Sequence, residues 1–305
     1  MLISAYWFFG NIGDLGDCMV SASKFHSVFM AGGGFMGSAI AFLIASKTDA
    51  KVYVYDISQE QLAKSSASVD KFGKSSQDKG FITADDFADL KKRISFTTDL
   101  QDAKHCSLVI EAIAENLEAK KKLFGKLDAI CPAECIFASN TSSLPITSLA
   151  AATKRSGQFI GMHFFSPAHV MKLVELINGF DTSQETLAKV RAFGEQLGKT
   201  IIQAKDYPGF ITTRLGLVLI NEAAFALMEG LSTAEDIDCG MTLGYNHPMG
   251  PLALADFIGL DICLHILETL HEGFGDPKYR PCPIIKQLVS AGHLGKKTGR
   301  GFYQY

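Results

Sequence analysis

The stretch that decides the fold class is Ser27–Ala31 followed by Gly32-Gly33-Gly34-Phe35-Met36-Gly37. Ser27–Ala31 predicts a short buried strand, and Met36–Ser46 predicts a helix of small and apolar residues. The glycines fit the spacing G-x-G-x-x-G at the turn between them. In such a turn the first glycine permits the tight bend, the second admits a pyrophosphate, and the third packs the helix on the strand. The stretch therefore predicts a dinucleotide-binding turn.

A carboxylate follows at the distance that this turn requires. The next predicted strand, Val52–Tyr55, ends at Asp56, 19 residues after Gly37 (56 − 37). A carboxylate there binds the adenosine ribose hydroxyls and repels a 2′-phosphate, so the pattern favours NAD over NADP. A glycine turn beside a solvated Asp56 is the structural alternative. Phe35 is bulky for a loop that faces a cofactor, and we expect its ring to turn away.

The chain alternates strands and helices as far as Lys205. Further strands are predicted at Ser107–Ala112, Cys135–Ala138, Phe159–Phe164 and Thr200–Gln203, and helices at Gln59–Lys79, from Thr83, at Leu117–Ile130 and at Thr182–Leu197. This order predicts a parallel sheet that is covered on both faces. After Asp206 only helices are predicted, at Phe210–Glu229, from Thr233 to Met241, at Leu252–Leu270 and at Ile284–Ala291.

The predicted fold class is α/β, with a Rossmann-like doubly wound sheet domain at residues 25–205 and an all-α domain at 206–305. Residues 1–24 form an N-terminal extension. Phe210–Glu229 is almost wholly apolar, and a helix that is apolar on every side must be buried. We therefore expect the helical domain to form a subunit interface as well as a core.

Composition excludes several other classes of protein. The 305 residues include 29 Lys and Arg against 32 Asp and Glu, a net charge of −3, which does not predict a nucleic-acid surface. At 47% hydrophobic residues the chain is not a disordered one, and no apolar run approaches the ~18 residues of a membrane span. The seven cysteines form no CxxC pair, so we expect reduced thiols and no metal site. Residues 1–24 match neither a secretory nor a mitochondrial signal, which predicts a cytoplasmic location.

Two polar groups follow predicted strands of the sheet. Glu115, with Lys120 five residues on, comes after Val109–Ala112, and Asn140 and Ser142 come directly after Cys135–Ala138. Ligands bind at the carboxyl edge of open α/β sheets, where these side chains should lie. The alternatives are a helix-dipole acid with a solvated lysine for the first group and helix capping for the second. Among these polar residues, Ser142 is the strongest candidate for a substrate contact.

A histidine and a glutamate stand in two neighbouring apolar runs. His163 lies in Phe159–Phe164, Glu175 lies in Leu173–Ile177, and a loop at Ser166–Val170 joins the runs. A buried charge needs a partner, so we expect the two side chains to face each other. A carboxylate fixes the imidazole tautomer and raises its pKa, which predicts a general base.

These motifs, in this order, resemble the L-3-hydroxyacyl-CoA dehydrogenase family, and the short bacterial 3-hydroxybutyryl-CoA dehydrogenases in particular. The resemblance runs from about Val28 to Tyr305 and includes Asp206-Tyr207-Pro208-Gly209-Phe210 and Gly295-Lys296-Lys297-Thr298-Gly299. It implies an NAD-dependent oxidoreductase of fatty acid β-oxidation or butanoate metabolism that acts on an acyl-CoA. It also implies a homodimer formed by the helical domain, with no nucleic-acid or membrane partner.

The resemblance assigns roles to individual residues. His163 is the base, Glu175 orients it, Ser142 binds the substrate oxygen, and Lys79 lies where the family places a basic residue near the CoA phosphates. NAD contacts fall on a set of residues in the sheet domain: Gly32, Gly34, Phe35, Met36, Gly37, Asp56, Glu115, Lys120 and Asn140.

Two positions depart from the family pattern. Thr213 and Ser166 stand where the family usually has Asn, and the Asn at the position of Thr213 is expected to bind the substrate. Loss of one oriented donor costs about a hundredfold in rate, so a slow enzyme is expected. A catalytically weak NAD-binding structural or interaction protein is the alternative, and a substrate without CoA is a third reading.

Overall fold

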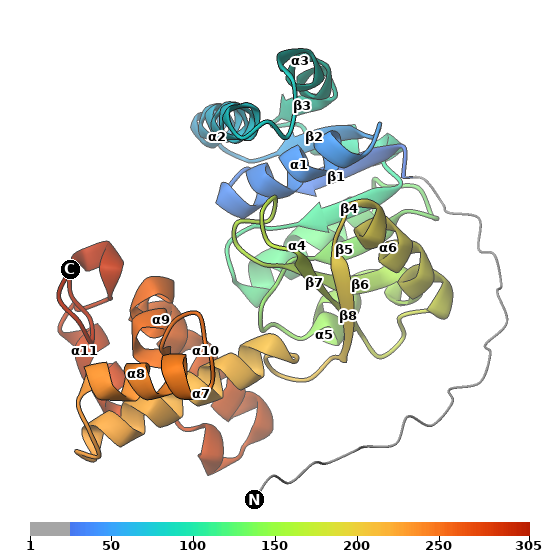
Figure 1. Cartoon of the computed structure of the whole chain (residues 1–305). Helices are drawn as coiled ribbons and strands as arrows, with labels where there is room; N and C mark the ends of the chain where they lie inside the picture. Colours follow the sequence, from blue (N-terminus) through green and yellow to red (C-terminus); the bar gives the residue numbers. More distant parts are fainter. Residues whose placement is uncertain (1–24) are drawn as a thin grey trace, which may run out of the picture.

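The computed structural model describes residues 25–305, which form a sheet domain followed by a helical domain (Figure 1). The predicted N-terminal extension, and Cys18 within it, lie outside the described residues. The other six cysteines are free thiols. No helix among residues 25–305 has the length and apolar character needed to cross a bilayer.

The sheet domain is built on one eight-stranded sheet. Its strands are β1 (Ser27–Ala31), β2 (Lys51–Tyr55), β3 (Ile94–Thr97), β4 (Leu108–Glu111), β5 (Ile136–Ser139), β6 (Phe159–Phe164), β7 (Leu173–Asn178) and β8 (Thr200–Lys205). Their order is β3-β2-β1-β4-β5-β6-β7-β8. From β1 the chain adds β2 and β3 on one side of that strand, and it then crosses over to place β4 on the other side. Ligands bind at the carboxyl ends of strands at such a switch point.

Two features of the sheet differ from the prediction. The pairing of β6 with β7 is antiparallel, because a loop of only eight residues, 165–172, joins them and parallel strands need a long crossover. The edge strand β3 was not predicted, since Ile94–Thr97 alternates apolar and polar residues over only four positions. The α/β class and the doubly wound sheet are confirmed.

Helices cover both faces of the sheet, as predicted. One face carries α1 (Phe35–Lys47), α2 (Gln59–Asp78), α3 (Ala84–Lys92) and α6 (Gln184–Gln196). The other carries the 3₁₀ helix η1 (Leu100–His105), α4 (Leu117–Asp128) and α5 (Ile146–Ala150); a short 3₁₀ helix, η2 (Ser156–Gln158), precedes β6. Alternate strand residues point to the two faces, so Met30 and Ile110 lie in one apolar core and Phe29 and Val109 in the other.

The helical domain contains α7 (Thr212–Met228), α8 (Ala234–Gly244), α9 (Pro251–Ile258), α10 (Leu260–Phe274), η3 (Pro277–Tyr279), α11 (Pro283–Ser290) and η4 (Lys296–Thr298). The prediction of a single helix at Leu252–Leu270 is wrong. Gly259 has a φ of 105°, outside the range of a helix, and separates α9 from α10. The helix predicted from Phe210 begins at Thr212, because Gly209 and Phe210 have φ values of 72° and 51°.

Helix α7 is not buried on every side of the single chain. Leu217, Ile220 and Ala224 pack in the core of the helical domain, whereas the Leu215 side chain is 65% exposed. One side of α7 therefore lies in the core of the helical domain, and burial of the other side in a subunit interface stays a prediction.

Candidate active site

The glycine turn between β1 and α1 has the close packing that its sequence predicts. Gly32 has a φ of 115°, and its N–H donates to the Tyr55 carbonyl over 2.8 Å. A Cβ at Gly37 would collide with the carbonyl of Gly32, so the helix can approach the turn only with glycine there. A Cβ at Gly34 would meet nothing within 4 Å. The open side of the turn, ahead of the α1 N-terminus, fits a pyrophosphate.

Phe35, the large side chain of the turn, points away from the cofactor side. Its ring packs edge-on against Phe72 of α2 at a centroid distance of 5.8 Å and does not line the cavities beside the turn. The expectation for the Phe35 ring is confirmed.

Asp56 lies directly against the glycine turn. Its Oδ2 accepts from the Gly33 N–H at 2.9 Å and its Oδ1 from the Ser58 N–H at 3.0 Å. With Gly32 and Gly34, Asp56 lines a cavity of about 630 Å³. A carboxylate fixed in this way retains lone pairs for ribose hydroxyls, so the residues present fit the adenosine half of NAD.

Lys120 and two carboxylates form a buried cluster beside the cleft. Lys120 is 1% exposed, and its Nζ lies 2.7 Å from Glu111 Oε1 and 3.0 Å from Glu115 Oε2. The alternative of a solvated lysine is therefore wrong. Burial alone would raise the pKa of Glu115, but Lys120, the Thr141 hydroxyl and the Ser142 N–H outweigh it and hold that pKa below its ordinary value. Glu115 is thus an anion held against the loop that carries Ser142.

The loop after β5 is fixed by hydrogen bonds at three residues. Asn140 Oδ1 accepts from the Phe164 N–H at 2.8 Å, which ties the loop to β6. Thr141 Oγ1 accepts from the Leu144 N–H at 2.9 Å, and Glu115 Oε1 accepts from the Ser142 N–H at 3.0 Å. Thr141 thus supports the turn, and the Ser142 hydroxyl points elsewhere.

The Ser142 hydroxyl contacts the predicted histidine–glutamate pair. His163 and Glu175 are direct partners in the antiparallel register of β6 and β7. His163 Nδ1 lies 3.2 Å from Glu175 Oε2, and His163 Nε2 lies 3.1 Å from Ser142 Oγ. An ionised carboxylate can only accept a hydrogen bond, so it selects the tautomer that carries its hydrogen on Nδ1 and leaves Nε2 as a free base. His163 is 6% exposed and Glu175 is fully buried.

Two residues at the start of the helical domain also bind Glu175, one through its main chain and one through its side chain. Its Oε1 accepts from the Ile211 N–H at 2.7 Å, and its Oε2 accepts from the Thr212 hydroxyl at 3.0 Å. Burial would raise the pKa of Glu175, but the bonds from His163, Ile211 and Thr212 outweigh it and lower that pKa. The anion is therefore kept at neutral pH.

The role predicted for Thr213, binding of the substrate, stays a prediction; the residue that the structure brings to the His163–Glu175 pair is its neighbour Thr212. No hydrogen bond from the Thr213 side chain to another residue of 25–305 is present, and Thr213 does not line the cavities described here. Thr212 carried no signal that separates it from Thr213, since only the geometry of the helix start distinguishes the two. Ser166, the other departure, lies exposed in the loop between β6 and β7.

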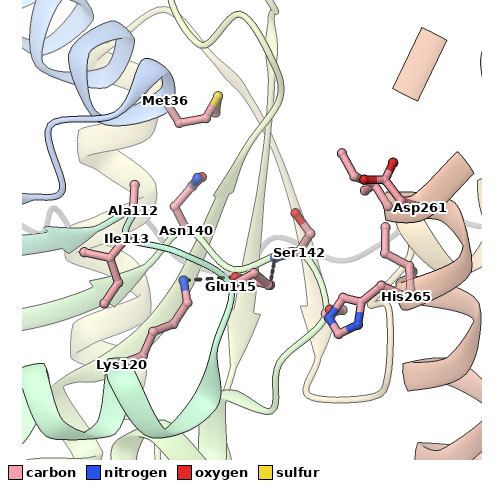
Figure 2. Close-up of a pocket in the computed structure, with 12 residues that line it drawn as sticks. Met36, Ala112, Ile113, Glu115, Lys120, Asn140, Ser142, Asp261 and His265 are labelled. Atoms are coloured by element: carbon pink, nitrogen blue, oxygen red, sulfur yellow. Dashed lines mark hydrogen bonds and ion pairs between the residues drawn. The ribbon is translucent and has the colours of Figure 1, made fainter. Parts of the chain in front are cut away.

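The Ser142 hydroxyl faces a cleft of about 450 Å³ between the two domains. Figure 2 shows Met36, Asn140, Ser142, Glu115 and Lys120 on the sheet side of this cleft and Asp261 and His265 of α10 on the opposite side. The contribution of α10 was not predicted, because Asp261 and His265 look like ordinary polar residues of an amphipathic helix.

Lys79 lies away from this cleft. It lines a separate cavity of about 740 Å³ between α1, α2, α3 and the β6–β7 loop. Lys47, Arg93 and His169 line the same cavity.

A dinucleotide turn with a ribose-side carboxylate, next to a cleft with an imidazole–carboxylate pair, defines an NAD-dependent dehydrogenase. Comparisons with known proteins agree. Residues 27–207 match the model of the 3-hydroxyacyl-CoA dehydrogenase NAD binding domain, and residues 209–305 match that of the C-terminal domain of the same family.

Similar proteins cover nearly the whole chain. A probable 3-hydroxybutyryl-CoA dehydrogenase of Bacillus subtilis is 51% identical over 91% of this chain and 96% of its own length. Human mitochondrial hydroxyacyl-coenzyme A dehydrogenase is 41% identical over 91% of this chain and 90% of its own length. The crystal structure of (S)-3-hydroxybutyryl-CoA dehydrogenase from Ralstonia eutropha superposes with a TM-score of 0.90 at 46% identity, covering 92% of this chain and 99% of that one. The chain belongs to the 3-hydroxyacyl-CoA dehydrogenase family.

Proposed function

We propose that this enzyme oxidises short L-3-hydroxyacyl-CoA esters, such as 3-hydroxybutyryl-CoA, to the 3-ketoacyl-CoA with NAD and also runs the reverse reaction. The observation that carries the residue roles is the chain of contacts Ser142 Oγ–His163 Nε2 and His163 Nδ1–Glu175 Oε2 at the interdomain cleft. The relatives named as 3-hydroxybutyryl-CoA dehydrogenases support the short-chain substrate. A cytoplasmic location stays a prediction.

His163 removes the proton of the substrate hydroxyl through Nε2. When bound, NAD would accept the hydride that substrate carbon C3 loses. As Nε2 takes the proton, the imidazole becomes a cation, and the buried Glu175 carboxylate stabilises it. Ser142 Oγ lies against Nε2 and donates to the same substrate oxygen. In the reverse direction the imidazolium returns the proton to the carbonyl oxygen.

We assign the NAD contacts to residues that line the turn and the cleft. Asp56 binds the adenosine ribose, and the main chain from Gly32 through Phe35 to Gly37 binds the pyrophosphate. Met36, Glu115, Lys120 and Asn140 line the cleft on the nicotinamide side. The Asp56 carboxylate at the ribose end of its cavity would repel a 2′-phosphate, which favours NAD over NADP.

The cavity that contains Lys79 suits the phosphates of CoA. Lys47, Lys79 and Arg93 provide cations there, and Ser46, Ser75 and Ser76 provide hydroxyls. Two buried nitrogen atoms of its lining, Arg93 Nε and His169 Nδ1, have no hydrogen-bond partner within the part of the chain that the structure describes. Free polar groups of this kind favour a polar ligand over an empty cavity.

Lys79→Ala is expected to raise KM for acetoacetyl-CoA about tenfold with little change in kcat, because a phosphate ion pair holds the substrate equally in the ground and transition states. Free acetoacetate should be turned over poorly by both proteins. The matched control is Lys104→Ala, which removes an exposed lysine of η1. Equal efficiency with acetoacetate and its CoA ester would refute the CoA site and favour a substrate without CoA.

We further propose that two chains pair through the helical domain. Large apolar side chains stay exposed there in the single chain: Leu215, Met228, Leu231, Leu243, Tyr245 and Phe257. Large apolar side chains that stay exposed in a single chain favour an interface between subunits.

Light scattering is expected to give twice the chain mass of 33.0 kDa. Leu215→Lys should shift the mass toward the monomer, since it places a charge on the 65% exposed side chain of α7. A wild-type protein that stays at the chain mass at high concentration would contradict the proposal.

A further inference from the structure

Glu111 is a buried ionisable residue without a role in the proposed proton transfer. It is the last residue of β4 and is fully buried. Its Oε1 accepts from Lys120 Nζ at 2.7 Å and from the Ile113 N–H at 2.7 Å, and its Oε2 accepts from Ser139 Oγ at 2.6 Å. A buried carboxylate is costly unless it is paired and hydrogen-bonded, so this arrangement calls for a function.

The bonds of Glu111 connect it to the cleft through Lys120. Lys120 Nζ also contacts Glu115 Oε2 at 3.0 Å, and Glu115 in turn binds the Ser142 N–H. Figure 2 shows Lys120, Glu115 and Ser142 in sequence along one wall of the cleft. Lys120 and Glu115 line this cleft, whereas Glu111 lies behind them.

The charges of Glu111, Lys120 and Glu115 do not cancel one another. Burial raises the pKa of Glu111, and Lys120, Ser139 and the Ile113 N–H oppose that rise by donating to the carboxylate. Both Glu111 oxygens accept hydrogen bonds, one of them from the Lys120 ammonium at 2.7 Å, and this geometry favours the carboxylate anion. With Glu115 also ionised and one ammonium between them, the cluster has a net charge of −1 in a largely buried place. Charges interact more strongly there than in water.

We propose that Glu111 is a positioning residue that, through this net negative charge, favours oxidised over reduced nicotinamide in the cleft. The proposal rests on the proposed function, which puts the nicotinamide beside Ser142. The oxidised ring carries a positive charge and the reduced ring is neutral, so a nearby net anion stabilises only the oxidised form. Lys120 alone would have the opposite effect, and Glu111 cancels it.

The test is a set of dissociation constants measured without turnover. Kd for NADH is measured by its fluorescence and Kd for NAD⁺ by calorimetry, in the wild type and in Glu111→Gln. The variant removes one negative charge and keeps the shape of the side chain. The ratio of Kd for NAD⁺ to Kd for NADH is expected to rise about fivefold or more. Ser139→Ala, which removes one hydrogen bond of Glu111 but no charge, should leave the ratio unchanged.

Lys120→Gln provides a second variant in case Glu111→Gln does not fold. It makes the cluster more negative, so the ratio should fall below that of the wild type. Glu111→Gln combined with Lys120→Gln isolates the charge of Glu111 in that background, and the ratio should rise again by about fivefold. Equal weakening of both forms, or an unchanged ratio, would overturn the electrostatic role of Glu111 while leaving the proposed function intact. A wild type that binds neither NAD⁺ nor NADH would instead overturn the proposed function.

Discussion

Replacement of His163 by Gln is expected to lower kcat with acetoacetyl-CoA by about 10²–10⁴-fold, the range that general acid–base catalysis supplies. The amide has nearly the shape of the imidazole but cannot take up a proton. NADH affinity should be unchanged within a factor of two or three, because His163 does not line the turn or the cleft walls assigned to NAD. Steady-state kinetics and NADH fluorescence measure the two quantities.

His105→Gln is the matched control, since it makes the same substitution at an exposed position of η1. Its activity should equal that of the wild type. A melting temperature of His163→Gln close to that of the wild type would exclude unfolding as the cause of the loss. A His163→Gln enzyme that retained more than about a tenth of wild-type kcat would show that another group serves as the base.

Glu175→Gln is expected to lower kcat by about 10³-fold. The Gln amide would donate a hydrogen to His163 Nδ1, whereas the carboxylate accepts one at 3.2 Å. The imidazole would then carry its hydrogen on Nε2, the atom that faces Ser142, and could not act as a base. The loss of charge would also leave the imidazolium without its partner.

Thr212→Val separates the charge of Glu175 from its hydrogen bonding. It removes one donor to the Glu175 carboxylate but leaves the charge, so kcat should fall about tenfold at most. Comparable losses in Thr212→Val and Glu175→Gln would show that Glu175 acts only by holding the fold together.

Glu175 also affects how the free energy of unfolding depends on pH in acid. The pKa of Glu175 is lowered in the folded protein, so its contribution to stability is complete above its ordinary value of 4.5 and is lost as the pH falls through the lower folded value. The free energy of unfolding should therefore fall less steeply in Glu175→Gln than in the wild type between about pH 5 and pH 3.

Much of the sheet domain could be predicted because its signals are local. The glycine turn, the carboxylate at Asp56 and the polar residues after apolar strands each follow from short-range rules. The facing of His163 and Glu175 followed from one energetic argument, that two buried ionisable groups in adjacent strands need each other. The structure places the pair in direct register.

The remaining features depend on contacts between distant segments. Nothing near Thr212 or Asp261 in the sequence shows that one would meet Glu175 and the other would line the cleft. The break between α9 and α10 depends on one glycine whose backbone leaves the helical region, and apolar periodicity continues across it. Glu111 could have been found, since a glutamate ending a buried strand needs a partner, but its link through Lys120 to Glu115 could not.

The most direct test of the account is NADH oxidation by the wild-type protein with acetoacetyl-CoA as substrate. The account predicts steady turnover, slowed at most about a hundredfold by Thr213 in place of the usual Asn. NADH that binds to the protein without being oxidised in the presence of acetoacetyl-CoA would contradict it. That result would favour a catalytically weak NAD-binding protein that serves a structural or interaction role on the same fold.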